Sequence, residues 1–486
     1  MNFEMPLFSV ALPDIFLLCA TSLILLIDVF LTERFRHLTY WLSQLTLIIG
    51  FMLVLAQYHD YPQEVITFSG HYVLDKLAVL TKLFVLLTTV FAFIYAKQYL
   101  KGRHMPRGEY YVLGLLAVIG MMVMASAFTF LTIYLGLELL SLSLYAMVAL
   151  QKNSRLAVEA SMKYFVMGAM ASGLLLYGMS MIYGMTGSIG INEISHILQQ
   201  TGAHQQAALL LGLVFILAGL IFKFGAVPFH VWVPDVYQGA PTSVTLFIAC
   251  APKIAAFCVT MRILVEAMPG LTIPWQHVLV VVAILSMLSG NVLAIAQTNI
   301  KRMLAYSSIA HIGYMLLGII AGPNDPQGYS AAMFYIATYV IVAAGAFAII
   351  ALLSKEGIEF DTLDDFRGLN ARNPWLAFMM LLLMFSMAGV PPTVGFFAKL
   401  GLLEALVHAH YVWLACLALL FAIIGAYYYL RVVMLMYFEE PKEALVGTHL
   451  AIARGPMVAI TVNGIAALML GLLPSALIDM CRISVA

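Results

Sequence analysis

Charged residues are scarce in this sequence. Lys, Arg, Asp and Glu make up only 10% of its 486 residues, whereas a soluble globular domain contains about 25%. The longest polar stretch, Ser354–Asn373, is only about as long as one membrane span, so no segment is long enough to form a separate soluble domain. The formal net charge of zero argues against a nucleic-acid partner.

Cysteine pairs and cofactor motifs are also missing. The five cysteines are scattered and none forms a C-x-x-C pair, which argues against iron–sulfur or zinc ligation by this chain. Neither G-x-G-x-x-G nor G-x-x-x-x-G-K-[ST] occurs, so no nucleotide or flavin site of those types is expected. We therefore predict that this chain binds no cofactor and no metal of its own.

Long apolar runs dominate what is present. Hydrophobic residues make up 63% of the chain, and runs of about 20 of them recur, each long enough to cross a bilayer. A membrane-spanning backbone must satisfy its own hydrogen bonds, so these runs are predicted to be helices. The prediction is an all-α polytopic membrane protein whose residues 1–486 form a single transmembrane domain. The expected fourteen spans are Phe8–Leu31, Leu38–Gln57, Lys76–Ala96, Tyr110–Ala127, Thr129–Leu150, Val158–Met185, Ala207–Tyr237, Pro241–Met268, Trp275–Ala296, Lys301–Ala321, Gly328–Ser354, Pro374–Val407, Tyr411–Phe438 and Pro456–Met480.

Basic residues gather in alternate connections between these spans. One side carries 16 of the 24 Lys and Arg residues, and the Gly187–Gln206 connection on the other side carries none. By the positive-inside rule the rich side is cytoplasmic, so both termini are predicted to be periplasmic. The start of the chain, Met1–Asp14, lacks the basic region of a signal peptide, and the first span is expected to be retained. The basic set on the rich side consists of Arg34, Arg36, Lys97, Lys101, Arg103, Arg107, Lys152, Arg155, Lys301, Arg302, Lys355, Arg367, Arg372, Arg431, Lys442 and Arg454.

Several spans carry a charged residue at bilayer depth. Such a charge costs about 2.5–3.5 kcal/mol on insertion scales and usually marks ion or proton traffic. Lys223 ends an apolar run that breaks at Gly225 and Pro228, and Lys253 follows Pro252 inside the next span. The sequence therefore predicts a functional row of charges within the membrane.

The two proline-interrupted spans predict an internal repeat. One is interrupted at Pro228 and the other at Pro391, and each interruption falls in the fourth span of a five-span block. Because five is odd, the second block would be inverted relative to the first, and such paired breaks point to a transport site near the membrane midplane. Two ordinary proline kinks are the alternative. The predicted layout is spans 1–3 in residues 1–109, spans 4–8 in 110–270, spans 9–13 in 271–440 and the last span in 441–486.

In these features the chain resembles the antiporter-like membrane subunits of respiratory complex I. The similarity covers essentially the whole sequence and includes the segments LGLELLSLSLYAMVAL, KFGAVPFHVWVPDVYQGAPT and GVPPTVGFFAKL. Mrp-type cation/proton antiporters and membrane-bound hydrogenases share this fold. The chain has Lys399 at the second break and ends soon after the last span. Both features favour the type of subunit that has a lysine at the second break and no long lateral helix.

The resemblance implies a role for each principal charge. Glu138 would be the span 5 glutamate that pairs with a lysine, either Lys163 or Lys223, while Lys253 would link two half-channels. Lys399 would deliver the proton outward. A structural ion pair is the competing interpretation for Glu138, and a lysine that snorkels to the lipid headgroups is the competing interpretation for Lys223.

Four further residues are weaker candidates. Lys163 lies near a span end, where snorkelling explains it as well. His230 follows the first break and can relay protons, although a packed core histidine fits too. Lys301 follows Glu138 at the same offset that separates the two prolines, yet it also sits beside Arg302 as an ordinary positive-inside anchor would. His311 either lines the proton path or packs in the core.

The expected function is that of a proton-translocating subunit of NADH–quinone oxidoreductase in a bacterial inner membrane. The resemblance implies that NADH, FMN, iron–sulfur clusters and quinone are bound by other subunits. It also implies neighbours of the antiporter-like M type and the small K type. Three alternatives remain open: a subunit of an Mrp-type Na⁺(K⁺)/H⁺ antiporter, a quinone-binding chain and a passive scaffold.

Overall fold

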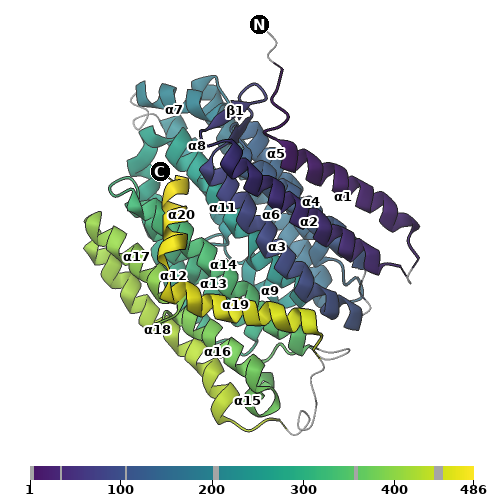
Figure 1. The fold of residues 1–486 in the computed structure, drawn as a ribbon. Coiled ribbons are helices and arrows are strands. Elements are labelled where there is room, and N and C mark those ends of the chain that lie inside the picture. The colour runs from purple at the N-terminus through teal and green to yellow at the C-terminus, as the bar shows by residue number, and fades with distance from the viewer. Residues whose placement is uncertain are drawn as a thin grey trace.

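The computed structural model describes residues 5–32, 35–103, 105, 107–200, 207–354, 359–442 and 452–485. Most of its helices run side by side along a common direction, and α7 and β1 lie at the opposite end from α15 (Figure 1). Arg34 and Lys355 of the basic set lie outside the described residues.

The first half contains α1 (Leu12–Phe30), α2 (His37–Asp60), β1 (Val65–Thr67), β2 (Tyr72–Leu74), α3 (Lys76–Gly102), α4 (Arg107–Ser126), α5 (Phe130–Val148), α6 (Arg155–Thr186), α7 (Ile191–Gln200), α8 (Ala207–Phe224), α9 (Trp232–Gly239), α10 (Thr242–Ala249), α11 (Ala251–Thr260) and the π-helix η2 (Met261–Ala267). The second half contains the 3₁₀ turn η3 (Pro269–Leu271), α12 (Thr272–Ile295), α13 (Ile300–Ala321), α14 (Gln327–Leu353), the 3₁₀ turn η4 (Leu363–Phe366), α15 (Leu369–Arg372), α16 (Pro374–Ala388), α17 (Val394–His408), α18 (Val412–Phe438), α19 (Arg454–Leu472) and α20 (Ser475–Val485).

The polytopic helical class is confirmed. Among the described residues, 13 helical segments are long and apolar enough to cross a membrane. The remaining predicted span, the twelfth, is formed by α16 and α17, which have 15 residues each. The three spans at the centre, Thr242–Ala267, Ile300–Ala321 and Gln327–Leu353, are the most enclosed by protein. Charged side chains on these helices therefore face protein rather than lipid.

The two predicted interruptions are present. α8 ends before Gly225, which has a positive φ of 73°, and α9 begins only at Trp232. α16 ends before Gly389, with a φ of 87°, and α17 begins at Val394. A positive φ is costly for residues other than glycine, so glycine at these two positions lets each helix stop inside the membrane.

Span 8 was predicted to be continuous, and this is wrong. Cys250 adopts a non-helical conformation between α10 and α11, and the span ends in η2. Pro252 lacks an amide hydrogen, so it fits the first turn of a new helix better than a helix interior. The consequence is that Lys253, like Lys223 and Lys399, lies next to a helix end.

Three small elements differ from the predicted layout. β1 and β2 form an antiparallel hairpin in which Val65 pairs with Leu74, whereas only helices were expected. The predicted connection Gly187–Gln206 contains α7. The predicted last span Pro456–Met480 is divided, because α19 ends at Leu472 and α20 follows it. These segments have only three to eleven residues, too few for their pattern to stand out beside long apolar runs.

Two helix pairs, α4 with α5 and α12 with α13, cross in the same way. A Cβ on Gly120 would lie 2.6 Å from the amide nitrogen of Leu140, and one on Gly290 would lie 2.6 Å from that of Ala310. The starts of α5 and α13 also match, since Thr129 and Asn299 each form an isolated β-bridge with a distant segment. The same offset in residue number relates Gly120 to Gly290, Leu140 to Ala310 and Thr129 to Asn299. This recurrence supports the predicted repeat, whose limits at 110–270 and 271–440 stay a prediction.

The offset in residue number between Gly120 and Gly290 is larger than the offset between the two prolines. It therefore pairs different residues of the two halves of the chain. Ser308, rather than Lys301, occupies the place in α13 that Glu138 occupies in α5, and His311 occupies the place of Ser141. The smaller offset between the two prolines does not apply at this crossing. The reason is that α14 and α16, with 27 and 15 residues, are shorter than their counterparts α6 and α8, with 32 and 18.

We expect Gly290→Leu to destabilise the protein, because the new side chain would collide with backbone atoms of α13. Overpacking of this kind typically costs about 1–3 kcal/mol. A lower melting temperature and a lower yield of assembled complex are the measurements. Gly173→Leu is the matched control, since a Cβ there meets nothing within 4 Å. Equal melting temperatures for the two variants would contradict the close crossing.

Candidate functional site

Each of three lysines lies beside a helix interruption and is held by a polar group. Lys223, near the end of α8, donates a hydrogen bond to Ser141 Oγ at 2.6 Å. Lys399, in α17, donates to the carbonyl oxygens of Met387 and Ala388 at 3.1 and 2.8 Å. These carbonyls lie at the end of α16 and have no helical partner, so the break itself provides the acceptors for the ammonium.

Lys253 occupies the centre of the row and is 3% exposed. Its ammonium contacts Ser308 Oγ and lies 3.4 Å from Tyr339 Oη. Both partners come from the second half of the chain, on α13 and α14, while Lys253 belongs to the first half. This lysine therefore connects the two halves of the chain, and its role between two half-channels stays a prediction.

Glu138 does not pair directly with a lysine. One of its carboxylate oxygens is buried and has no hydrogen-bond partner, and it makes no ion pair within 4.0 Å among the described residues. Ser141, one helical turn further along α5, holds Lys223 instead. The predicted contact is therefore wrong for this state, although Glu138 remains close enough to act on Lys223 electrostatically.

His311 connects the centre of the row to its far end. Its Nδ1 lies 2.7 Å from Tyr335 Oη, and its Nε2 lies 2.9 Å from Tyr429 Oη. A cavity of about 20 Å³ and a second of about 10 Å³ each touch both His311 and Lys399, and a water molecule needs about this much space.

The ring of Tyr339 completes the contact, since it lies 4.9 Å from His311 and 4.9 Å from the Lys253 ammonium. His311 thus lies among polar groups between two lysines. The first part of the row is different, because no hydrogen-bonded chain joins Lys223 to Lys253 among the described residues.

Among the described residues, Lys163 and His230 make no hydrogen bond or ion pair with the residues of this row. Lys163 forms ion pairs with Glu159 at 2.8 Å and Asp235 at 2.7 Å, and its side chain is 41% exposed. It is therefore not the partner of Glu138. His230 lies half-buried in the turn between α8 and α9, with its Nδ1 buried and unpaired.

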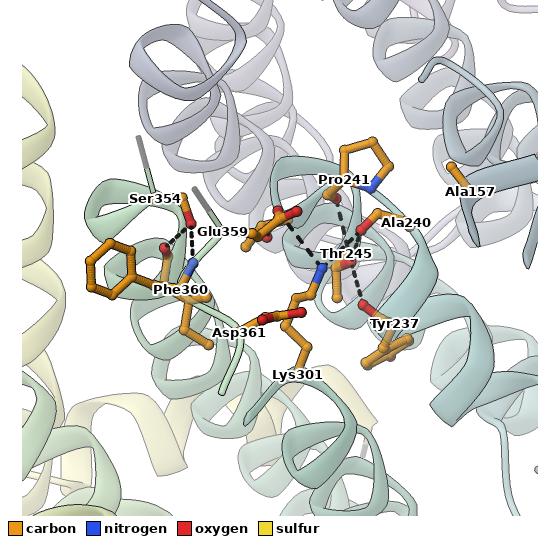
Figure 2. Close-up of polar contacts among 12 residues, drawn as sticks. Ala157, Tyr237, Ala240, Pro241, Thr245, Lys301, Ser354, Glu359, Phe360 and Asp361 are labelled. Carbon is orange, nitrogen blue, oxygen red and sulfur yellow. Dashed lines mark hydrogen bonds and ion pairs between the residues drawn. The ribbon is translucent and has the colours of Figure 1, made fainter. Parts of the chain in front are cut away.

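Lys301 faces inward. It is 2% exposed, and its ammonium donates to the carbonyl oxygen of Ala240 at 3.2 Å and lies 3.8 Å from Glu359 (Figure 2). An anchor to lipid headgroups would have an accessible ammonium, so that alternative is wrong. Lys301 instead reaches the junction between α9 and α10.

Two buried ionic clusters were missed. Lys82 is fully buried and contacts Asp14 at 2.8 Å and Tyr72 Oη at 2.7 Å. Arg262 is 1% exposed and pairs with Asp75 and Glu266. The position of Lys82 inside an apolar run was a signal that the sequence offered. Over the residues that the structure describes, no group of three or more His, Cys, Asp or Glu side chains is placed to hold a metal ion.

Comparisons with known proteins show the family of this chain. Residues 127–425 match the family model described as NADH:quinone oxidoreductase/Mrp antiporter, transmembrane. The chain belongs to this family. NADH-quinone oxidoreductase subunit N of Thioalkalivibrio sulfidiphilus is 52% identical over 480 residues, which cover 99% of this chain and 98% of the relative. The subunit of the same name from Coxiella burnetii is 53% identical, with 97% of each chain covered.

Two solved structures have the same architecture. A chain of respiratory complex I from Thermus thermophilus is 31% identical and superimposes with a TM-score of 0.81, with 96% of this chain and 98% of that chain covered. A chain of the Mrp complex from Dietzia sp. DQ12-45-1b has a TM-score of 0.84 at 22% identity, with 99% and 97% covered. The second likeness concerns the fold alone.

Proposed function

We propose that this chain is the N-type proton-translocating subunit of a bacterial NADH–quinone oxidoreductase. The observation that carries the proposal is the row Lys223, Lys253, His311 and Lys399, which runs through the protein interior beside three helix interruptions. The relatives named subunit N, which are about half identical over nearly the full length, support this type over the M and L types. NADH, flavin, iron–sulfur clusters and quinone are then bound by other subunits.

In this proposal the row passes protons between two half-channels. A buried ammonium is costly, and a nearby carboxylate or a set of free carbonyls stabilises it. Changing the charge of Glu138 would therefore alter how firmly Lys223 holds its proton. The work required to move each proton across the membrane is modest, since one charge moved against 100 mV costs about 2.3 kcal/mol.

The orientation belongs to the same proposal. The side rich in Lys and Arg faces the cytoplasm, both termini face the periplasm, and the repeats at 110–270 and 271–440 contribute one half-channel each. The M-type and K-type subunits are the proposed neighbours of this chain in the membrane.

We expect purified complex in proteoliposomes to pump protons during NADH oxidation at a rate that does not depend on Na⁺. The reason is that the ammonium groups of the row repel Na⁺, whereas a hard cation prefers carboxylates and carbonyls. A pH-sensitive dye inside the vesicles measures the transport. A requirement for Na⁺ or K⁺ would favour the Mrp-type alternative over this function.

A further inference from the structure

Glu359 lies where solvent meets the buried lysines. It belongs to the segment between α14 and η4 and accepts hydrogen bonds from Tyr99 Oη at 2.7 Å and Thr242 Oγ1 at 3.0 Å. Its carboxylate also lies 3.5 Å from Arg103 and 3.8 Å from the Lys301 ammonium. Helix ends and loops that are distant in sequence thus meet at this one carboxylate.

The two ends of the Glu359–Lys301 contact differ in exposure. The side chain of Glu359 is 26% exposed, whereas that of Lys301 is 2% exposed. An acid that touches solvent therefore adjoins a base that does not. Figure 2 shows Lys301 extending toward Glu359 on one side and Ala240 on the other.

The charge of Glu359 is set by its surroundings. Burial raises its pKa, but the positive charges of Lys301 and Arg103 and the hydrogen bonds from Tyr99 and Thr242 together outweigh burial, and the pKa lies below its usual value. The hydroxyl of Tyr99 also faces this carboxylate, and Asp361 lies close enough to Lys301 to act on its charge. Glu359 is thus an anion at neutral pH.

Beyond Lys301 the polar groups continue toward Lys253. Lys301 and Ser308 are seven residues apart, so they share one face of α13 at a separation of about 10 Å. Ser308 holds Lys253. The hydroxyl of Tyr237 is buried without a hydrogen-bond partner, and Thr245 Oγ1 donates to the Tyr237 carbonyl at 3.0 Å. An unpaired buried hydroxyl is costly, and it offers an intermediate station for a proton.

We propose that Glu359 collects protons from the basic side of the membrane and passes them to Lys301, which supplies the row at Lys253. The inference rests on the proposed function. In the step, a water or hydronium O–H bond breaks as the Glu359 carboxylate is protonated. The new O–H bond then breaks as neutral Lys301 takes the proton, which restores the carboxylate. The 3.8 Å separation is longer than a hydrogen bond, so the transfer requires one bridging water or a side-chain shift of about 1 Å.

Glu359→Gln in the assembled complex tests this proposal. Glutamine keeps an oxygen that accepts from Tyr99 and Thr242, so the fold is expected to be retained while the charge is lost. We expect NADH-driven pumping to fall about tenfold at alkaline pH, which is 1.4 kcal/mol in the barrier, and to recover toward acid pH as bulk protons become abundant. In the unmodified complex Glu359 is ionised across this pH range, so the rate of proton pumping does not change with pH. A Glu359→Gln complex with a flat profile would overturn the proposal.

Asp364→Asn is the matched control. Asp364 lies in the same segment, its side chain is 57% exposed, and it pairs with Arg367 rather than with Lys301, so a flat profile is expected. If Glu359→Gln does not assemble, Lys301→Met must lower pumping across the whole pH range, because the relay itself is lost, and normal pumping there refutes the route. Lys253→Met is measured in parallel. A block in Lys253→Met beside normal Glu359→Gln overturns this inference alone, while normal pumping in both overturns the proposed function as well.

Discussion

Lys253→Met is expected to lower NADH-driven proton pumping by about tenfold or more, a loss typical of removing a proton-transfer group. Lys253 is the group from the first half of the chain that contacts both Ser308 and Tyr339. Methionine fills a similar volume but carries no proton. Because the row would be cut at the junction of its two halves, the defect should appear in pumping and in quinone-coupled electron transfer.

Assembly of the Lys253→Met complex is expected to survive. The substitution removes a buried charge rather than adding one, and apolar replacement of a buried charge is often tolerated when no counter-charge remains. Ser308 Oγ loses its donor but can turn to a carbonyl one turn earlier in α13. Oxidation of NADH by an artificial acceptor, which bypasses the membrane arm, should therefore stay normal.

Lys152→Met is the control, because Lys152 lies exposed in the turn between α5 and α6. It removes one lysine from the same chain without touching the row. Rates of proton pumping measured with a pH-sensitive dye separate the two variants. A normal pumping rate in Lys253→Met would mean that protons bypass this lysine, and the proposed row would then be wrong.

The interruptions could be predicted because their causes are local. Gly225, Pro228, Gly389 and Pro391 each disfavour a continuous helix by their own backbone chemistry, and a neighbouring lysine marks the function. The structure also explains why a lysine lies at the second interruption. The Lys399 ammonium donates hydrogen bonds to the carbonyl oxygens that the end of α16 leaves without helical partners. Cys250 carries no such signal, so the interruption of span 8 was hidden even though Pro252 lies two residues away.

Contacts between distant segments could not be predicted in the same way. Glu359 lies in a short polar loop, and its partner Tyr99 is 260 residues away, so only the packed fold reveals the pair. Likewise, the sequence left the partner of Glu138 open between Lys163 and Lys223. The hydrogen bond of Lys223 to Ser141 depends on the register between α5 and α8, which no periodicity in one sequence fixes.

Glu138→Gln is expected to reduce coupled electron transfer and pumping roughly tenfold, or 1.4 kcal/mol in the rate-limiting barrier. Glutamine has nearly the same shape, so packing between α5 and its neighbours is preserved. What is lost is the negative charge near Lys223, with which Glu138 interacts electrostatically without contact. One carboxylate oxygen has no hydrogen-bond partner in this state, so replacing the carboxylate with an amide breaks no hydrogen bond at that oxygen.

Two further variants make this prediction decisive. Ser141→Ala removes the hydroxyl that holds Lys223 while keeping Glu138, and it is expected to produce a smaller fall in the same direction. Glu109→Gln is the control, because Glu109 is 53% exposed at the start of α4 and faces Arg36. If Glu138→Gln and Glu109→Gln pump equally well, the charge in α5 serves only packing. If Glu138→Gln alone is slow while its melting temperature is unchanged, the charge acts on the proton at Lys223, because a purely structural role would have lowered stability first.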